Sequence, residues 1–587
     1  MIDETIASPT PPIGSHVEAR ATDSLVLAIV GSGGDGVALL GDLLLRMAAE
    51  RGLYGILVQS YGPQIRGGES AVLLRIAREE THYEGDETDL LLCFRLGDLR
   101  RFQGSIKLHP RSIVVLDAAD TTDPPEWLGL SELQPFRHPF ATIVDGQEVP
   151  GEPKNMMGLA LLCRALGWAP EHARQAIEKR FAHKPPLVAR NLATFDRAWA
   201  TEAMPRLPAL HGHGVPLQVE SGNEAAARGA IAAGLKFFAG YPITPSSEIM
   251  ETLIDELPPA GGRVVQAEDE IAALGMVIGA SFGGVPAMTA TSGPGLSLMT
   301  EMLGLSSMAE IPTVVVDCQR VGPATGIPSR TEQSDLYHAV YGGHGDFPRA
   351  VLGVFDTVHA RDVMFKAFHL AERYQLPVLV LSDAYVAQRR QIRDPAVDRI
   401  EAPQRKAWKP GDAAARFDVT GAHGVGAFRI PGTEGGTYMA AGIEHTPDGN
   451  PTSDTVMHHT MNTKRFKKLD GIAAETGDWF RTLGRADAPL GIIAWGSMYG
   501  LLYEWVREHP EYRVFLPEII HPFPLRGLSA WRQGLGRTWT LELSFQRQFH
   551  RYLSSLSDLT GVIAAARSGG LPLSTAELSR MLTEASS

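Results

Sequence analysis

Short apolar runs of strand length alternate with amphipathic runs of helix length through most of this chain. The alternation starts with a predicted strand at 25–30 and a predicted helix at 37–49, and it resumes after 220 and again after 488. Parallel strands joined by crossover helices produce this order. At 587 residues the chain is also too long for a single hydrophobic core. The sequence therefore predicts a multidomain α/β protein with doubly wound sheets.

The predicted strands form three groups, and the segments between the groups set the domain boundaries. The first group lies at 25–30, 55–58, 71–76, 89–94 and 112–116, with a helical stretch at 155–199. The second group lies at 236–239, 263–266, 286–290, 313–317, 350–354 and 377–382. The third lies at 491–494, 513–517 and 539–543. The predicted parts are a flexible tail (1–22), a first domain (23–204), a linker (205–219), a second domain (220–390), an extended connector (391–484) and a smaller C-terminal α/β domain (485–587).

The linker after Met204 contains several prolines and glycines, and the domains on either side have apolar strands of their own. Removal of residues 1–204 is therefore expected to leave a soluble core.

Charge and cysteine content exclude several classes of protein. Lys and Arg total 54 against 67 Asp and Glu, a net charge of −13 that argues against nucleic-acid binding. No apolar run approaches the roughly 18 residues of a membrane span. The 3 cysteines have no paired spacing, so we expect buried free thiols, a reducing cytoplasmic location and too few ligands for a standard cluster of four cysteines. The histidines show no metal-binding spacing, so no metal site is predicted.

The stretch from Gly240 to Glu248 joins a predicted strand to a predicted helix. Thr244 is placed to cap that helix and Pro245 to occupy its first position. Such a helix start directs free backbone N–H groups and a positive dipole end toward the sheet edge, where an anion can bind. An ordinary strand-to-helix turn has the same pattern, so this stretch alone leaves both interpretations open.

Three further turns follow strands at what should be the same sheet edge. Glu268 and Glu270 open a helix of small residues, where first-turn acids also simply stabilise the helix dipole. Glycine-rich turns follow at 291–295 and 318–326. Arg320 directly follows an apolar strand, where a guanidinium can bind a carboxylate in bidentate fashion, although a surface arginine has the same pattern. Ligands bind at this edge of an open α/β sheet, so we predict a binding site here.

A G-x-G-x-x-G turn at Gly31–Gly36 also joins a strand to a helix, as in dinucleotide-binding folds. That function needs an acidic residue at the end of the next strand. The next predicted strand ends in Gln59 and Ser60, so NAD binding is kept only as an alternative.

Taken together, these motifs resemble the α subunit of the 2-oxoacid:ferredoxin oxidoreductases, in the form with the γ domain fused at the N-terminus. Asp35, Ala324 and Ser544 depart from the residues usual in that family. The resemblance covers nearly the whole chain and rests on Gly31–Gly36, Ser60–Pro63, Arg66–Gly68, Tyr241–Ser247, Thr291–Gly295, Gly322–Gly326, Gln333–Leu336, Trp495–Ser497 and His521–Pro524.

The resemblance implies that thiamine diphosphate binds between two subunits. The α chain would supply the pyrimidine-binding domain at 220–390, and a separate β subunit would supply the Mg²⁺–diphosphate site and a [4Fe–4S] cluster. Gly34–Gly36 lacks the later asparagine pair of the diphosphate motif, in agreement with this division. The γ domain (23–204) would help to hold coenzyme A.

By the same resemblance, Glu270 would contact the aminopyrimidine of thiamine and promote removal of its C2 proton. It is preferred to Glu268 because it stands nine residues before Gly279, as expected in related pyruvate enzymes. Arg320 would clamp the 2-oxoacid carboxylate beside the Thr244 hydroxyl. The predicted catalytic residues are Glu270, Thr244 and Arg320. The predicted cofactor-binding residues are Tyr241, Pro242, Ile243, Thr244, Glu270, Ser292 and Gly293.

The activity implied by the resemblance is the reversible conversion of 2-oxoglutarate and CoA to succinyl-CoA and CO₂, with electrons passed to ferredoxin. The enzyme would be active only with its β subunit, in an (αβ)₂ assembly. The 2-oxoglutarate preference rests on the fused γα layout, and the same chemistry on pyruvate or another 2-oxoacid is the first alternative. An NAD-linked dehydrogenase and a non-catalytic scaffold are the others.

Overall fold

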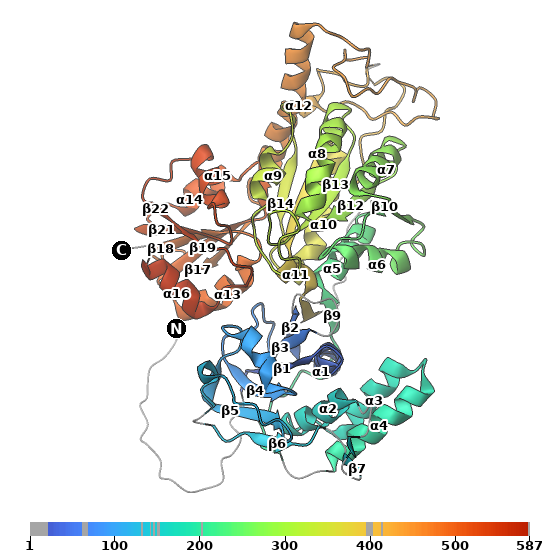
Figure 1. Ribbon diagram of the computed structural model, residues 1–587. Coiled ribbons are helices and arrows are strands. Elements are labelled where there is room, and N and C mark those ends of the chain that lie inside the picture. Colours follow the sequence, from blue (N-terminus) through green and yellow to red (C-terminus); the bar gives the residue numbers. More distant parts are fainter. Residues whose placement is uncertain are drawn as a thin grey trace.

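The computed structural model describes most of the chain. Two parts of the motifs that resemble the family, Gly62–Pro63 and Arg66–Gly67, lie outside the described residues. The predicted tail also lies outside them, apart from Thr22. The described residues are 22–61, 68–130, 133–140, 143–144, 147–148, 153–200, 204–394, 403–412 and 415–584. Sheets of eight, seven and five strands organise them, together with a two-stranded ribbon, β7 (Ile143–Val144) and β8 (Gln147–Glu148). Helices cover the three sheets, which lie side by side around the middle of the molecule (Figure 1).

The first sheet is mixed. Its strand order is β6-β5-β4-β1-β3-β2-β16-β9; β1 pairs in parallel with β4 but antiparallel with β3. The antiparallel half follows from the chain itself, because only seven residues separate β2 from β3 and leave no room for a crossover helix. Its strands are β1 (Ser24–Ser32), β2 (Tyr54–Tyr61), β3 (Glu69–Ala77), β4 (Thr88–Cys93), β5 (Leu108–Asp117), β6 (Phe136–His138), β9 (Gln218–Ser221) and β16 (Arg390–Arg393).

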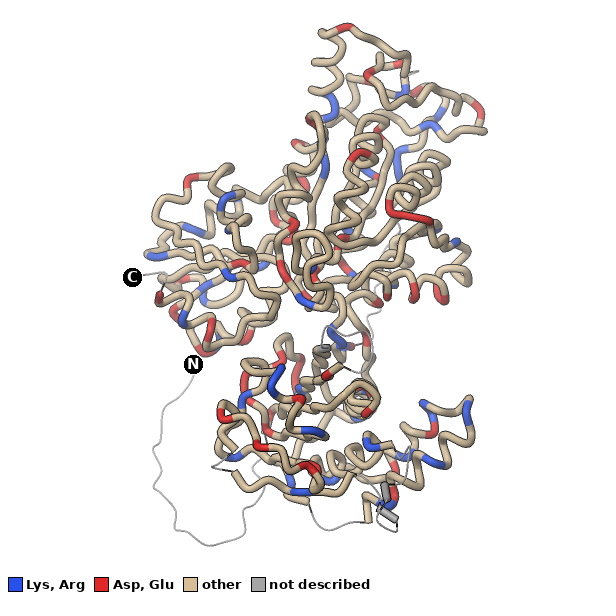
Figure 2. Tube along the Cα trace, in the orientation of Figure 1, with Lys and Arg blue, Asp and Glu red and all other residues tan. Residues whose placement is uncertain are grey.

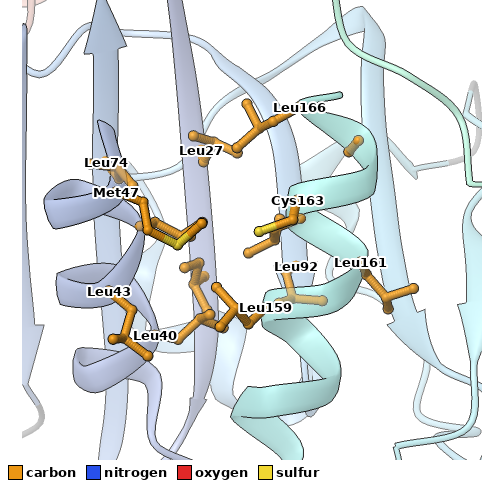
Figure 3. Close-up of a cluster of buried hydrophobic side chains, with 14 of the residues drawn as sticks. Leu27, Leu40, Leu43, Met47, Leu74, Leu92, Leu159, Leu161, Cys163 and Leu166 are labelled. Atoms are coloured by element: carbon orange, nitrogen blue, oxygen red, sulfur yellow. The ribbon is translucent and has the colours of Figure 1, made fainter. Parts of the chain in front are cut away.

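Helices α1 (Val37–Glu50) and α2 (Lys154–Ala165) cover one face of this sheet. Leucines and Met47 of α1 face Leu159 and Cys163 of α2 across strands that carry Leu27 and Leu92 (Figure 3). All of these side chains are buried, which explains why the predicted strand and helix pattern was so regular here. Helices α3 (Pro170–Phe181) and α4 (Pro185–Trp199) pack beside α2.

The second sheet has the order β11-β10-β12-β13-β15-β14-β20, and all strands but β20 are parallel, as predicted. Helices α5 (Gly222–Ala232), α6 (Ser247–Glu256) and α10 (Thr357–Tyr374) share one apolar core, and α7 (Glu270–Phe282), α8 (Gly293–Met308) and α9 (Leu336–Tyr341) share another. Its strands are β10 (Phe237–Gly240), β11 (Arg263–Gln266), β12 (Ala287–Thr291), β13 (Thr313–Gln319), β14 (Ala350–Gly353), β15 (Pro377–Asp383) and β20 (Ile519–His521), and the short helix α11 (Ala384–Gln388) follows β15.

The third sheet, order β17-β19-β18-β21-β22, lies in the C-terminal part of the chain. Its strands are β17 (Phe480–Gly484), β18 (Leu490–Ala494), β19 (Tyr512–Pro517), β21 (Arg537–Glu542) and β22 (Val562–Ala566). Its helices are α13 (Met498–Glu508), α14 (Leu525–Trp531), α15 (Gln548–Leu556) and α16 (Thr575–Glu584). Charges of both signs are spread over the whole trace (Figure 2).

The stretch predicted as an extended connector contains a helix that was not predicted, α12 (Thr455–Glu475). Its buried face carries Lys464 and Lys468, which are both 1% exposed, so the usual apolar stripe is missing from the sequence. Their ammonium groups lie 2.5 and 2.7 Å from the carboxylate of Glu310, which is fully buried. A buried charge cluster therefore attaches α12 to the second sheet.

A short segment of the first domain connects all three sheets. The Glu504 carboxylate on α13 accepts hydrogen bonds from Thr81 Oγ1 (2.7 Å) and the His82 N–H (3.1 Å). His82 Nδ1 lies 3.0 Å from Asp356 at the start of α10. In addition, β9 and β16 complete the first sheet. Neither was among the predicted strands, and neither lies in the predicted first domain. The first sheet thus crosses the predicted boundaries at two places.

None of the described helices is both long and apolar enough to cross a bilayer. Cys93, Cys163 and Cys318 are buried free thiols, as predicted. In the described part of the chain, no three His, Cys, Asp or Glu side chains are grouped so as to hold a metal ion.

Candidate active site at the edge of the second sheet

The carboxyl ends of β10, β11, β12 and β13 lie at one edge of the second sheet. The turns that follow these strands are 241–246, 267–269, 292 and 320–335. Because neighbouring parallel strands end at the same edge, residues far apart in sequence meet there. The predicted convergence of four turns at one edge is confirmed.

The turn after β10 differs from its prediction in one respect. Helix α6 begins at Ser247, and Ser246 occupies its N-cap, so the prediction that Thr244 caps the helix is wrong. The N–H groups of Ser246 and Ser247 donate to the Ile243 carbonyl at 2.9 and 3.1 Å, because the chain makes an extra turn before the helix. Those two donors are therefore not free for an anion. Tyr241, Pro242 and Thr244 are exposed, and Ile243 is half-buried.

Arg320 lies beside Thr244, as expected. Its Nη1 donates to the Thr244 carbonyl at 2.6 Å, and the residue is only 7% exposed. Nε is buried and has no hydrogen-bond partner among the described residues. Burial lowers the pKa of Arg320, and the nearby carboxylate of Asp335 opposes that shift. A guanidinium held by one of its five donors keeps the others for a ligand.

The two glutamates at the start of α7 have opposite environments. Glu268 is exposed, whereas Glu270 is 6% exposed and is the first residue of the helix, which Asp269 caps by accepting from the Ala272 N–H at 2.7 Å. Glu270 lies against Gly295: a methyl group there would come within 2.7 Å of Glu270 Oε1 and would also collide with Thr291. Only glycine fits at this position.

The 291–295 turn, which links β12 to α8, contains further buried polar groups. Ser292 is fully buried, and its Oγ has no hydrogen-bond partner among the described residues. Gly293 packs against Asp335, whose Oδ2 would lie 2.7 Å from a methyl group at that glycine. Sequence analysis did not assign a role to Asp335 or to Asp317, which lies within β13. The available signal for Asp317 was an acidic residue at the end of the predicted apolar strand 313–317.

The glycine turn of the first sheet, Gly31–Gly36, is filled by side chains of the chain itself. The Asp35 carboxylate accepts from the Ser32 N–H at 2.7 Å, and Asp98 accepts from the Ser32 hydroxyl at 2.7 Å. Two carboxylates in the turn oppose the binding of a pyrophosphate. This geometry counts against the NAD alternative.

Two cavities adjoin the site. One of about 340 Å³ is lined by Thr244, by Glu248 and Glu251 of α6, and by Arg390. A larger one of about 670 Å³ lies where the three sheets meet and is lined by residues of each. Gln59 and Gln388 line both cavities.

Arg330 lines the larger cavity, and sequence analysis did not single it out. Its stem packs on Gly570 of the C-terminal part, and its Nη1 lies 3.4 Å from Ser60 Oγ of the first sheet. No carboxylate pairs with Arg330 among the described residues, and burial lowers its pKa, as does the nearby Arg101.

Comparisons with known proteins show the family of the chain. The family model "Pyruvate flavodoxin/ferredoxin oxidoreductase, thiamine diP-bdg" matches residues 228–465, and the model "Pyruvate ferredoxin/flavodoxin oxidoreductase" matches residues 26–201. The 2-oxoglutarate oxidoreductase subunit KorA of Mycobacterium tuberculosis is 32% identical over 538 residues, covering 84% of this chain and 80% of the relative. The chain belongs to the 2-oxoacid:ferredoxin oxidoreductase family. It is an oxidoreductase with a thiamine-diphosphate-binding domain, and the predicted family and fold class are confirmed.

Two further family members illustrate the extent of the similarity. The 2-oxoglutarate synthase subunit KorA of Methanothermobacter marburgensis is 44% identical over 282 residues, covering 47% of this chain and 73% of the relative. A solved structure of 2-oxoglutarate:ferredoxin oxidoreductase from Magnetococcus marinus, with 2-oxoglutarate, coenzyme A and succinyl-CoA bound, superposes with a TM-score of 0.86 at 30% identity. The match covers 96% of this chain and 100% of that one.

Proposed function

We propose that this chain is the α subunit of a 2-oxoglutarate:ferredoxin oxidoreductase. In the proposed reaction 2-oxoglutarate, CoA and oxidised ferredoxin give succinyl-CoA, CO₂ and reduced ferredoxin, reversibly. The observation that carries the proposal is the meeting of Arg320 and Thr244 at the same sheet edge as the buried Glu270. The substrates named for the M. tuberculosis, M. marburgensis and M. marinus relatives support the choice of 2-oxoglutarate.

The residues present fit the pyrimidine end of thiamine diphosphate. The Glu270 carboxylate is buried and accepts no hydrogen bond in the described part of the chain, and it packs closely against Gly295, where a methyl group would collide with it. The Ser292 hydroxyl is a second buried group without a partner. When bound, the cofactor supplies the carbon nucleophile and the electron sink for decarboxylation. Glu270 would hold a proton at the pyrimidine nitrogen, and Tyr241, Pro242, Ile243 and Gly293 would line the ring.

Arg320 and Thr244 are assigned to the 2-oxoacid. Arg320 retains unpaired donors, and a guanidinium fork matches the two oxygens of a carboxylate. Its hydrogen bond to the Thr244 carbonyl fixes its position next to the Thr244 side chain, which is exposed and lines the smaller cavity. The carboxylate would therefore be held at the mouth of that cavity.

A β subunit would complete the cofactor site with Mg²⁺, the diphosphate-binding residues and a [4Fe–4S] cluster, in an (αβ)₂ assembly that exchanges electrons with ferredoxin. The surface next to Glu270 suits such a partner. Ile271 and Met276 of α7 and Leu298 of α8 are 43%, 41% and 50% exposed, and apolar side chains that gather near a half-site favour a protein interface. Gly279, also on the exposed side of α7, allows a close approach.

Coenzyme A is assigned to the two adjoining cavities. Its phosphates would lie in the 670 Å³ cavity near Arg330 and Arg580, neither of which pairs with a carboxylate among the described residues. Its thiol arm would pass between Gln59 and Gln388 into the 340 Å³ cavity and reach Thr244. A long ligand with a polyanionic end and a neutral arm matches this shape and charge.

The test is co-production of the chain with a family β subunit, followed by measurement of ferredoxin reduction. We expect turnover with 2-oxoglutarate and CoA that exceeds turnover with pyruvate, and none with NAD in place of ferredoxin. Arg330→Gln should raise the KM for CoA about 5- to 50-fold through loss of a charged contact, with the KM for 2-oxoglutarate unchanged. Faster turnover with pyruvate would contradict the substrate, and an unchanged KM for CoA would contradict the cavity assignment.

A further inference from the structure

The 320–335 loop, which follows β13, carries two of the arginines that the proposed function assigns to substrates. Arg320 is the first residue of the loop, and the N–H of the adjacent Val321 donates to the Arg330 carbonyl at 3.0 Å. The Ile327 N–H donates in turn to the Val321 carbonyl, also at 3.0 Å. These backbone bonds tie the two sides of the loop together. A displacement of Val321 therefore moves Arg320 and Arg330 together.

Two glycines that follow β22, Gly569 and Gly570, pack on this loop from the C-terminal part of the chain. The Gly569 N–H donates to Glu332 Oε1 at 3.1 Å. Gly570 lies so close that a methyl group on it would be 2.8 Å from Arg330 Cβ and 3.0 Å from Val321 Cγ2. Carbon atoms in contact prefer a separation of about 3.5–4.0 Å. The loop thus fits against a hydrogen atom at this position and against nothing larger.

The turn that contains the two glycines is held from its own side. Gly569 and Gly570 have φ of +125° and +77°, where glycine is favoured. Nη2 of Arg567 donates to the carbonyls of the two residues that follow the glycines, at 2.7 and 2.9 Å. The Arg567 N–H donates to the Glu542 carbonyl at the end of β21, at 3.2 Å. Because the turn is fixed in this way, a group added at Gly570 would displace the loop.

The loop cannot avoid such a group by a side-chain rotation or a movement of the whole loop. The Cβ atom of Arg330 moves only with its backbone, and the β-branched Val321 is stiff at χ1. The other end of the loop is anchored, because the Gln333 N–H donates to the Leu543 carbonyl at 2.7 Å and Gln333 Nε2 donates to the Trp495 carbonyl at 2.9 Å. The displacement would therefore fall on residues 320–330.

We propose that Gly570 is a positioning residue for both substrates, because its contact with the loop sets where the guanidinium groups of Arg320 and Arg330 lie. The inference rests on the proposed roles of these two arginines. Its extension to Arg320 follows from the chain, since Val321 is the next residue. Arg320 is itself held at the Thr244 carbonyl by a hydrogen bond of 2.6 Å, so a shift of its backbone changes its position relative to Thr244.

The two cavities allow positioning to be separated from simple obstruction. Gly570 lines the larger cavity, so a methyl group there also narrows the proposed CoA site. The smaller cavity contains Thr244, and none of the described residues that line it belongs to the C-terminal part of the chain. An effect of Gly570 on 2-oxoacid binding must therefore pass through the loop.

The experiment compares Gly570→Ala with Gly561→Ala in the αβ complex. Gly561 directly precedes β22 and has φ of +79°, so alanine there brings similar backbone strain, but its methyl group would have no described atom within 4 Å. The measured quantities are kcat, the KM values for 2-oxoglutarate and CoA, thiamine diphosphate affinity by calorimetry, and the unfolding temperature.

Gly570→Ala should raise the KM for 2-oxoglutarate about tenfold and also raise the KM for CoA, with thiamine diphosphate affinity unchanged. Relief of the 2.8 Å contact needs a shift of roughly 0.7 Å, and a misplacement of about 1 Å can cost about 10²-fold. Gly561→Ala should lower the unfolding temperature but keep both KM values native.

A native KM for 2-oxoglutarate in Gly570→Ala would overturn the proposal. A rise in the KM for CoA alone would overturn it too, because it would indicate obstruction of the larger cavity. So would an equal rise in Gly561→Ala, because backbone strain without the contact would then suffice. If Gly570→Ala does not fold, Val321→Ala removes the contact from the other side; the KM for 2-oxoglutarate should again rise with thiamine diphosphate affinity native, and a native KM would contradict the proposal.

The result is separable from the proposed function. A native complex that does not turn over 2-oxoglutarate contradicts the proposed function. Turnover by the native complex, with a KM for 2-oxoglutarate that neither Gly570→Ala nor Val321→Ala changes, contradicts only this inference.

Discussion

Two glycine-rich turns of this chain, 31–36 and 291–295, join a strand to a helix in the same way, yet they have opposite environments. In the first, Asp35 accepts from the Ser32 N–H and Asp98 from the Ser32 hydroxyl, and Asn155 of α2 lies against Gly36. In the second, Ser292 Oγ remains without a partner among the described residues, and Gly295 packs tightly against Glu270 and Thr291. The Ser32 donors of the first turn are therefore paired within the chain, whereas the second turn keeps a buried hydroxyl unpaired.

The neighbouring strands explain the difference. Strand β1 is flanked on one side by the antiparallel β3, so the Gly33 N–H donates to the carbonyl of Gly68 at 2.8 Å. Strand β12 is flanked by the parallel β10 and β13, so other strand ends bring Thr244 and Arg320 to the same edge. A glycine-rich motif indicates only that the backbone can make a tight turn, whereas a ligand site also needs side chains that converge from several strands.

The largest expected effect comes from removing residues 1–204. The remaining β16 would lose its partner β2, exposing a strand edge with Ile392, which is 1% exposed in the intact chain. Glu504 and Asp356 would lose Thr81 and His82. Unpaired strand edges favour aggregation, so we expect insoluble protein in place of the soluble core expected from the linker. A truncated protein that stays in the supernatant and unfolds cooperatively would show that the first sheet is separable after all.

Glu270→Gln should have the next largest effect. Glutamine has the same size but cannot act as the charged acceptor, so exchange of the thiamine C2 proton should slow by about 10²-fold or more. Hydrogen–deuterium exchange at C2, measured by NMR in the αβ complex, checks this. Glu268→Gln is the control, because Glu268 is exposed and precedes the N-cap Asp269, and an exposed acid near a helix start contributes only about 0.3–1 kcal/mol. If Glu268→Gln slowed C2 proton exchange more than Glu270→Gln does, the role in thiamine activation would belong to Glu268, two residues earlier.

Arg320→Lys tests the carboxylate assignment. Lysine keeps the charge but loses the planar fork, so kcat/KM for the 2-oxoacid should fall about 5- to 150-fold, or about 1–3 kcal/mol. Thiamine diphosphate affinity, measured by calorimetry, should be unchanged. An exposed arginine on the same sheet, Arg263 of β11, offers the matched control, and Arg263→Lys should leave both quantities unchanged. Equal losses of cofactor and substrate binding in Arg320→Lys would mean that Arg320 is structural.

Gly36→Ala should have the smallest effect on activity and a clear effect on stability. Gly36 has φ of +76°, and a methyl group there would collide with Asn155. The left-handed conformation alone costs alanine about 1–2 kcal/mol. The unfolding temperature should drop by several degrees in a thermal scan, while kcat of the remaining folded complex stays native. A specific loss of activity in this variant, without loss of stability, would restore a ligand-binding role for the first turn.

Much of the architecture follows from local patterns. The parallel strands of the second sheet match their predictions to within one or two residues, because apolar runs and glycine turns alternate cleanly there, whereas the antiparallel edge strand β20 was not predicted. The misses have physical reasons. Helix α12 buries Lys464 and Lys468 against Glu310, so its inner face does not look apolar. Strands β9 and β16 have four residues each and join the first sheet through the pairing of β16 with β2.

The candidate site also combines features that local patterns predict with features that depend on packing. Motif spacing predicted that the turns carrying Thr244, Glu270 and Arg320 reach the same sheet edge, and only the resemblance to a known family suggested roles for these residues. Only the tertiary structure distinguished the buried Glu270 from the exposed Glu268 on physical grounds. Burial and electrostatic neighbours depend on how distant segments pack, and local sequence carries no record of that packing. The sequence determined which turns meet, and the fold decided which of their side chains are enclosed.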